Sequence, residues 1–257
     1  MRHMKNYLAK QLFQSAFYPA LFLILMWLVF ALQGQFNNRL VPWGVLPREA
    51  GGLPGVFTSV FIHGDLNHIL SNSFPILILG MMLFYFYKKI AKQAFVWIWL
   101  ISGIWLWVGG RNSAEHPNYH IGASTLIYGL ATFLFFSGVF RKHLRLMVVS
   151  ALVVFLYGSI VWGMFPIKTE ISWEGHLFGA IAGVLVAYNY RKEGPQRREF
   201  HWNEDEETPH IPEHLWQGNP EELKPDAHLE MDRVEGKEEE KRRDINIRYF
   251  YKGKRGF

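Results

Sequence analysis

Long apolar stretches alternate with short polar connections from the N-terminus to about residue 190. A helix needs ~20 mostly apolar residues to cross the hydrocarbon core of a bilayer, and six stretches approach that length. The sixth is short, but it runs into Arg191 and Lys192, whose side chains can reach the interface. The pattern predicts an all-α membrane protein, a bundle of six transmembrane helices at residues 14–33, 67–87, 92–109, 121–140, 146–165 and 176–190.

Acidic residues divide the chain into two parts. Only seven of the 22 acidic residues lie in residues 1–200, and the remainder follow. We therefore expect a six-helix transmembrane domain over residues 1–195 and a charged cytoplasmic tail over residues 196–257. Low aliphatic content predicts that the tail is largely disordered. Its basic and aromatic end, residues 245–257, is compatible with a short strand or with binding to the anionic inner leaflet.

The positions of Lys and Arg predict the orientation. They cluster before the first span, between the second and third, between the fourth and fifth, and after the sixth, whereas the other connections hold fewer. The positive-inside rule places both termini in the cytoplasm, and an even number of spans requires the termini to share a side. The first apolar stretch is too long for a signal peptide and no A-x-A-like site follows it. We expect a multi-pass protein of a bacterial inner membrane.

Composition removes several kinds of chemistry. The chain has no cysteine, which excludes disulfides, a thiolate nucleophile and a cysteine-ligated zinc site. The net charge of +5 does not indicate a nucleic-acid partner, because the basic clusters lie between apolar stretches and report membrane orientation.

Polar residues inside predicted spans carry the candidate chemistry, because a polar group in the bilayer is costly. The second, fourth and sixth spans all run from the outside to the inside, so their polar groups fall at a similar depth near the outer ends. A serine, a histidine base and two hydrogen-bond donors at one depth predict a single site. The residues are His68 and Asn72 on one helix face, Ser124 and Tyr128 at the start of the fourth span, and His176, followed by Gly179 and Gly183.

Each of these features has a purely structural interpretation. A lone serine near a helix end usually bonds its own backbone. A lone histidine there is more often packed than catalytic, and a GxxxG pair most often lets two helices approach closely. Close approach is also compatible with a site, because it could bring His176 to Ser124.

Taken together, the segments resemble the rhomboid proteases over roughly residues 50–190. The matching features are the GxS of Gly122 and Ser124 with Tyr128 one turn later, the later His176 with Gly179 and Gly183, and the earlier HxxxxHxxxN of His63, His68 and Asn72. The resemblance implies that Ser124 is the nucleophile and His176 the general base. It also implies that Tyr128 packs on the histidine ring, and that His68, Asn72 and the Ser124 backbone N–H form the oxyanion hole.

The implied activity is that of an intramembrane serine endopeptidase without metal or cofactor. It would hydrolyse peptide bonds in or near transmembrane segments of membrane proteins, with the lipid bilayer as its surroundings. The family uses a Ser–His dyad with no acidic third member, and no Asp or Glu lies inside the predicted spans. Asp65 and Glu174 lie at loop edges and receive no catalytic role.

The chain departs from the family pattern at two places. Thr125 follows the serine where many members have glycine, and a β-branched residue there predicts restricted backbone freedom and a modest loss of activity. Pro54 and Gly55 stand where many bacterial members carry a Trp-Arg pair, so the first outer loop is expected to differ in shape. His120 and Arg111 have no assigned role, and we interpret them as a loop brace.

Three alternatives remain open at this point. A rhomboid-like pseudoprotease would bind membrane proteins without cleaving them, although such members typically lose the serine or the histidine. A metal enzyme could use His63, His68, His120 and His176, but no HExxH occurs. A transporter would place its polar groups near the bilayer centre, whereas these lie near one surface.

Overall fold

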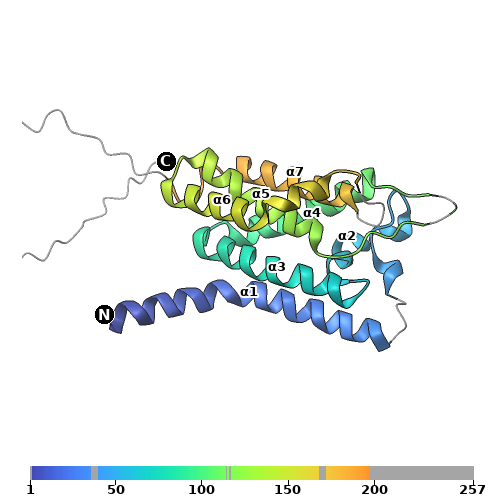
Figure 1. The fold of residues 1–257 in the computed structure, drawn as a ribbon, viewed down its shortest axis with the longest axis horizontal. Helices are drawn as coiled ribbons and strands as arrows, with labels where there is room; N and C mark the ends of the chain where they lie inside the picture. Colours follow the sequence, from blue (N-terminus) through green and yellow to red (C-terminus); the bar gives the residue numbers. More distant parts are fainter. Residues whose placement is uncertain (1, 36–39, 114, 116, 168–171, 197–257) are drawn as a thin grey trace, which may run out of the picture. The chain divides into compact units, whose positions relative to one another are not determined.

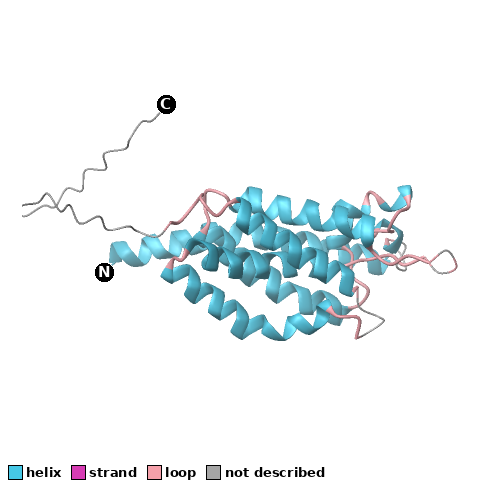
Figure 2. Ribbon diagram, turned by 90° about the horizontal axis from the view of Figure 1, so that it is seen from above, coloured by secondary structure: helices cyan, strands magenta, loops and turns pink. Residues whose placement is uncertain are grey.

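A computed structural model describes residues 2–35, 40–113, 115, 117–167 and 172–196 (Figure 1). All of these residues belong to one compact unit, Met1–Glu199. Figure 2 shows helices joined by loops, and the described residues contain no strand beyond an isolated bridge between Val45 and His120. The α-helices are α1 (Arg2–Gln35), α2 (Gly55–Thr58), α3 (Leu66–Phe86), α4 (Ala91–Gly109), α5 (Ser124–Arg141), α6 (Leu144–Tyr157) and α7 (Trp173–Asn189). The 3₁₀ helices are η1 (Val41–Trp43), η2 (Ala50–Gly52), η3 (Ser59–Phe61) and η4 (Gly158–Met164).

Five of the six predicted apolar segments overlap one α-helix each, and the segment at 146–165 is divided between α6 and η4. Four of the described helices, α1, α3, α4 and α5, are long and apolar enough to cross a membrane. Helices α6 and α7 have 14 and 17 residues, shorter than a typical span. The all-helical fold is therefore confirmed, whereas the count of six spans stays a prediction. The predicted charged tail lies outside the described residues, and the division at residues 195 and 196 also stays a prediction.

Helix α5 lies at the centre of the bundle. Of its apolar stretch 56% is buried, against 22–33% for the other three long helices. Helices α3, α4, α6 and α7 all pack on it, whereas α1 lies on the outer side of α3 (Figure 1). The fully buried side chains of the core are large and apolar, among them Ile76, Leu79, Leu83, Ile98, Leu126, Leu130, Phe133 and Leu134.

Helices α5 and α7 approach each other through glycine. A Cβ atom on Gly179 would lie 2.9 Å from the carbonyl carbon of Thr125, and one on Gly183 would lie 2.9 Å from that of Gly129. Both distances are shorter than a van der Waals contact, so only glycine permits this packing. The GxxxG pair therefore brings the two backbones together, as small residues do between membrane helices.

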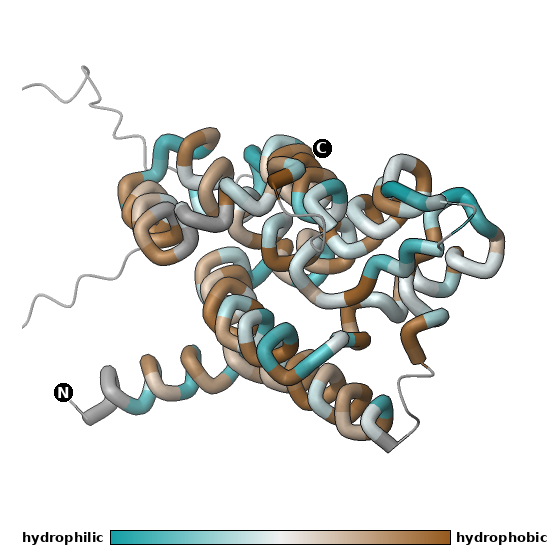
Figure 3. The backbone as a smooth tube through the Cα atoms, turned by 45° about the vertical axis from the view of Figure 1, so that its right-hand side comes forward, coloured by the Kyte–Doolittle hydropathy of each residue, from teal (hydrophilic) through white to brown (hydrophobic). Residues whose placement is uncertain are grey.

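The connection between α1 and α3 packs against the segment that precedes α5. Val45 and His120 exchange backbone hydrogen bonds of 2.9 and 2.8 Å, and the Gly122 N–H donates to the Ser59 carbonyl at 2.9 Å. Val56 and Val60 of this loop are buried, whereas Leu53 and Phe57 are exposed. Figure 3 shows hydrophobic positions along the helices and hydrophilic positions gathered in the connection between α4 and α5. The loop thus holds the entry to α5 from one side.

Candidate active site

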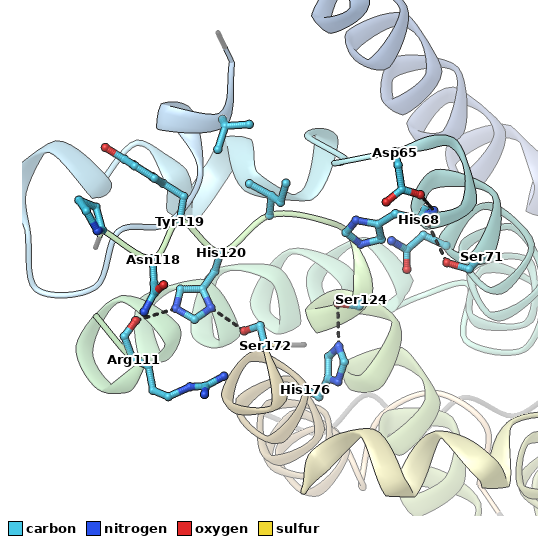
Figure 4. Close-up of a pocket in the computed structure, with 14 residues that line it drawn as sticks. Asp65, His68, Ser71, Arg111, Asn118, Tyr119, His120, Ser124, Ser172 and His176 are labelled. Carbon is cyan, nitrogen blue, oxygen red and sulfur yellow. Dashed lines mark hydrogen bonds between the residues drawn. The ribbon is translucent and has the colours of Figure 1, made fainter. Parts of the chain in front are cut away.

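The starts of three helices surround one cavity of about 770 Å³. Helix α3 contributes His68 and Asn72, α5 contributes Ser124, and α7 contributes His176. The predicted common depth of these four residues corresponds to this arrangement, because each lies in the first two turns of its helix. Other lining residues come from the connections, among them Asp65, Arg111, Tyr119, His120 and Ser172 (Figure 4).

Ser124 and His176 lie within hydrogen-bonding distance. The Nε2 atom of His176 is 2.9 Å from the Ser124 hydroxyl oxygen, and its Nδ1 atom is 2.8 Å from the carbonyl oxygen of Gly163 in η4. A carbonyl oxygen only accepts, so Nδ1 carries the ring proton in the neutral imidazole. Nε2 is then the acceptor, and the Ser124 hydroxyl donates to it. The geometry therefore selects the tautomer that can receive a proton from the serine.

Tyr128 fixes the plane of the histidine ring. The two rings stack with centroids 4.1 Å apart and planes 8° from parallel. Tyr128 lies one turn after Ser124 on α5, so one helix positions both the hydroxyl and the stacking surface. The structure thus brings Tyr128 to the place that the resemblance implied.

Gly122 shapes the turn before Ser124. Its φ of +103° lies in a region of backbone conformation that residues with a Cβ atom rarely adopt. A Cβ atom here would also lie 2.5 Å from His68 Nε2 and 3.5 Å from Asn72 Nδ2. Glycine is therefore needed at residue 122 for two reasons. It permits the positive φ of the turn, and it leaves room for His68 and Asn72 of α3 beside the turn.

Asn72 presents a donor that is unused within the described part of the chain. Its side chain is buried, and Nδ2 has no hydrogen-bond partner there. A buried donor without an acceptor is costly, and functional sites are a common reason for it. Helix α3 holds this donor in place, since the Asp65 carboxylate caps the helix by accepting from the His68 N–H at 2.9 Å.

His63 lies behind His68, away from the cavity lining. It is fully buried, and its ring meets the His68 ring edge-on with centroids 4.9 Å apart. Burial, followed by the neighbouring His68, lowers the pKa of His63 to about 4, so its ring is neutral at neutral pH. A neutral ring can pack on His68 without placing a positive charge beside it.

The structure also gathers polar groups that the sequence left unassigned. His120 Nδ1 is 2.6 Å from the Ser172 hydroxyl oxygen, and His120 Nε2 is 3.0 Å from the Arg111 carbonyl oxygen (Figure 4). The Arg111 guanidinium forms an ion pair with the buried Glu174. These contacts agree with the interpretation of His120 and Arg111 as a loop brace. Sequence reasoning missed Ser172, Gly163 and the burial of Glu174, and only the N-cap position of Ser172 before α7 offered a signal.

Both departures from the family pattern lie outside the cavity lining. Thr125 is buried, and a Cβ atom on Gly175 would lie 2.8 Å from its hydroxyl oxygen, so the side chain occupies space that Gly175 leaves free. Pro54 directly precedes α2, and Gly55 packs closely on the backbone of Gly44. The effect of either on activity stays a prediction.

No metal cluster is present in the described ranges. Within them, no three His, Cys, Asp or Glu side chains come close enough together to hold a metal ion. The four histidines of the metal-enzyme alternative accordingly do not form a ligand set. Both ring nitrogens of His120 and of His176 lie instead against hydroxyl or carbonyl oxygens.

The apolar helices are those of a membrane protein, and its cavity contains a serine–histidine pair. The chain belongs to the rhomboid family, because residues 50–193 match the Rhomboid domain. It is 35% identical over 175 residues to an uncharacterized protein of Mycobacterium tuberculosis, covering 65% of this chain and 71% of that one. It is 32% identical to an uncharacterized protein of Mycobacterium leprae, covering 65% and 68%. A Bacillus subtilis protein provisionally named as a rhomboid protease is 28% identical, covering 52% of this chain and 65% of its own.

Proposed function

We propose that this protein is an intramembrane serine endopeptidase that cleaves membrane proteins in or near their transmembrane segments. The observation that carries the proposal is the hydrogen bond of 2.9 Å between Ser124 and His176, with the histidine tautomer set by Gly163. Family membership and the provisional name of the Bacillus subtilis relative agree with this activity.

In the first step His176 Nε2 takes the Ser124 proton as Ser124 Oγ attacks the carbonyl carbon of the scissile bond. The imidazolium that forms keeps its Nδ1–H on the Gly163 carbonyl, which favours the charged ring. The carbon–nitrogen bond then breaks, and the leaving amine takes the proton from Nε2. The same histidine then deprotonates a water molecule, which attacks the carbonyl carbon of the acyl-enzyme. The bond from that carbon to Ser124 Oγ breaks, His176 returns the proton to Oγ, and the second product leaves as a carboxylic acid.

The tetrahedral intermediate needs hydrogen-bond donors for its oxyanion. The unused Nδ2 group of Asn72 and a ring N–H of His68 line the cavity beside the serine. The N–H of Ser124 lies in the first turn of α5, where N–H groups have no intrahelical acceptor. Helices α3, α5 and α7 also start at the cavity, so the positive ends of three helix dipoles point toward the developing negative charge.

The proposed topology has six spans with both termini in the cytoplasm of a bacterium and the cavity near the outer membrane surface. The basic connections support this orientation, and the position of the cavity gives water access to the serine. A regular substrate helix hides its carbonyl groups in hydrogen bonds. We therefore expect substrates with helix-breaking residues near the cleaved bond.

Labelling with a fluorophosphonate probe tests the nucleophile. Wild-type protein in detergent should be labelled on Ser124, with labelling lost in Ser124→Ala and strongly reduced in His176→Ala. Ser71 provides a matched control, because it lines the same cavity and its hydroxyl donates to the His68 carbonyl at 2.8 Å. Ser71→Ala should be labelled like the wild type, and undiminished labelling of Ser124→Ala would refute the assignment.

Cleavage of a transmembrane substrate separates the protease from the pseudoprotease. Wild-type protein in liposomes should yield two products whose new ends mass spectrometry locates in or near the spanning segment. A folded protein that binds this substrate but neither cleaves it nor reacts with the probe would establish the pseudoprotease instead.

A further inference from the structure

We propose that His120 and Ser172 form a positioning clamp that sets the placement of His176 against Ser124, an inference that rests on the proposed function. Their side chains meet at 2.6 Å beside the same cavity. His120 lies four residues before Ser124, and Ser172 lies four residues before His176. The pair therefore joins the two segments that carry the catalytic groups, at four residues before each of those groups.

The hydrogen bonds around the clamp form a consistent chain of donors and acceptors. His120 Nε2 faces the Arg111 carbonyl, so Nε2 carries the proton and Nδ1 accepts. The Ser172 hydroxyl then donates to Nδ1, and its oxygen accepts from the Gly175 N–H at 3.3 Å as the N-cap of α7. Burial, the largest influence, lowers the pKa of His120, which keeps the ring in the neutral form that this arrangement needs.

Along α7, the clamp lies before His176, whereas the close contact of Gly179 with α5 lies after it. Gly179 holds α7 against the α5 backbone one turn after His176. Ser172 holds it, one turn before His176, against His120 in the connection that leads into α5. These two contacts hold the first turn of α7 on both sides of His176. Without the clamp that turn keeps the ion pair between Arg111 and Glu174 and the hydrogen bond of His176 to the Gly163 carbonyl. The Arg111 side chain is 45% exposed, and solvent weakens such pairs.

His176 is thus expected to shift when the clamp is removed, and a misplacement of about 1 Å can cost on the order of 10²-fold in rate. Because the ion pair remains, we expect His120→Ala to lower kcat by about 10- to 100-fold with little change in KM. Fluorophosphonate labelling of Ser124 should slow in the same proportion. The clamp is one hydrogen bond between two side chains, so His120→Ala combined with Ser172→Gly should be no slower than the slower single variant.

Two Ser172 variants separate the clamp from the helix cap. Glycine is nearly as good an N-cap as serine but has no hydroxyl, so Ser172→Gly should keep the thermal stability and lose kcat. Ser172→Thr keeps the hydroxyl and should restore most of kcat. Thr132→Val provides a matched control, since Thr132 donates from α5 to the Ala180 carbonyl of α7 at 2.8 Å, away from the cavity. This variant should lose stability and keep kcat.

All variants are measured in the full-length protein, with cleavage rates normalised to the folded fraction. The inference is overturned if His120→Ala and Ser172→Gly keep the wild-type kcat, or if their effects multiply in the double variant. It is also overturned if kcat falls equally in Thr132→Val. An inactive and unlabelled wild type would instead refute the proposed function, so the two failures can be told apart.

Discussion

Replacing Gly179 with alanine tests whether the approach of α7 to α5 controls the Ser124–His176 pair. The new Cβ atom would lie 2.9 Å from the Thr125 carbonyl carbon, whereas ordinary contact begins at 3.4 Å. The carbonyl oxygen of Thr125 would lie closer still, and backbone atoms cannot rotate away, so the difference of about 0.5 Å between these two distances is the least by which α7 must withdraw. Transferred to the site, this would stretch the hydrogen bond from 2.9 Å to about 3.4 Å, where little of it remains.

We expect Gly179→Ala to lower kcat by about 10- to 100-fold and to destabilise the fold by about 1–3 kcal/mol, a typical cost of overpacking. Gly183→Ala meets a similar obstacle at Gly129, about 6 Å further along the helix at 1.5 Å per residue. Gly183→Ala should lower the stability by a similar amount and kcat by a smaller factor. The displacement of α7 is largest at the substituted residue, and Gly183 lies further from His176 than Gly179 does. Gly51→Ala is the control, since a Cβ atom there meets nothing within 4 Å.

The assay measures cleavage of a transmembrane substrate in detergent, with thermal unfolding of the same preparations. A Gly179→Ala protein of lowered stability but normal kcat per folded molecule would refute the reasoning. So would equal losses of kcat in Gly179→Ala and Gly183→Ala, since position along the helix would then not matter.

Three further predictions follow from the site. His68→Ala and Asn72→Ala should each lower kcat by about 10²- to 10³-fold while the protein stays folded, and a normal kcat in both would exclude the oxyanion role. Folding lowers the pKa of His63 from 6.5 to about 4, so as the pH falls the unfolded chain takes up this proton before the folded chain does. The contribution of neutral His63 to the free energy of unfolding is therefore fully present only above about pH 6.5. Stability should fall by up to about 3 kcal/mol toward pH 4, and denaturation against pH should show a smaller fall in His63→Gln. A chain ending at residue 196 should cleave substrate at the wild-type rate, and a metal chelator should not change that rate. If this shorter chain folds but is inactive, part of the site lies in the tail.

Much of the fold follows from apolar segment length, because backbone groups in a membrane must satisfy one another within helices. The helix boundaries follow less well. The predicted span at residues 121–140 begins three residues before α5, because the positive φ of Gly122 turns the chain first. The predicted span at residues 146–165 is divided into α6 and the 3₁₀ helix η4, and hydropathy does not distinguish these two kinds of helix.

The sequence predicts the main side chains of the candidate site better than it predicts the groups that hydrogen-bond to them. Ser124, His176 and Asn72 stand out because a polar residue within an apolar segment is conspicuous. Ser172 lies in a polar connection, where a serine attracts no notice. The burial of Glu174 and the contact of His120 with Ser172 depend on how two connections fold over the bundle, and no periodic pattern encodes that.

The Gly163 carbonyl has a consequence for how the site can be altered. The group that orients His176 belongs to the main chain, so no codon change removes it while leaving the chain intact. An alanine scan would identify Ser124 and His176 and pass over their third companion. A loss of activity in Gly163→Ala would reflect a different cause, because the added methyl group meets the Tyr128 hydroxyl. Unlike a carboxylate, a carbonyl does not titrate, so acid can switch off the proposed base only by protonating the imidazole itself.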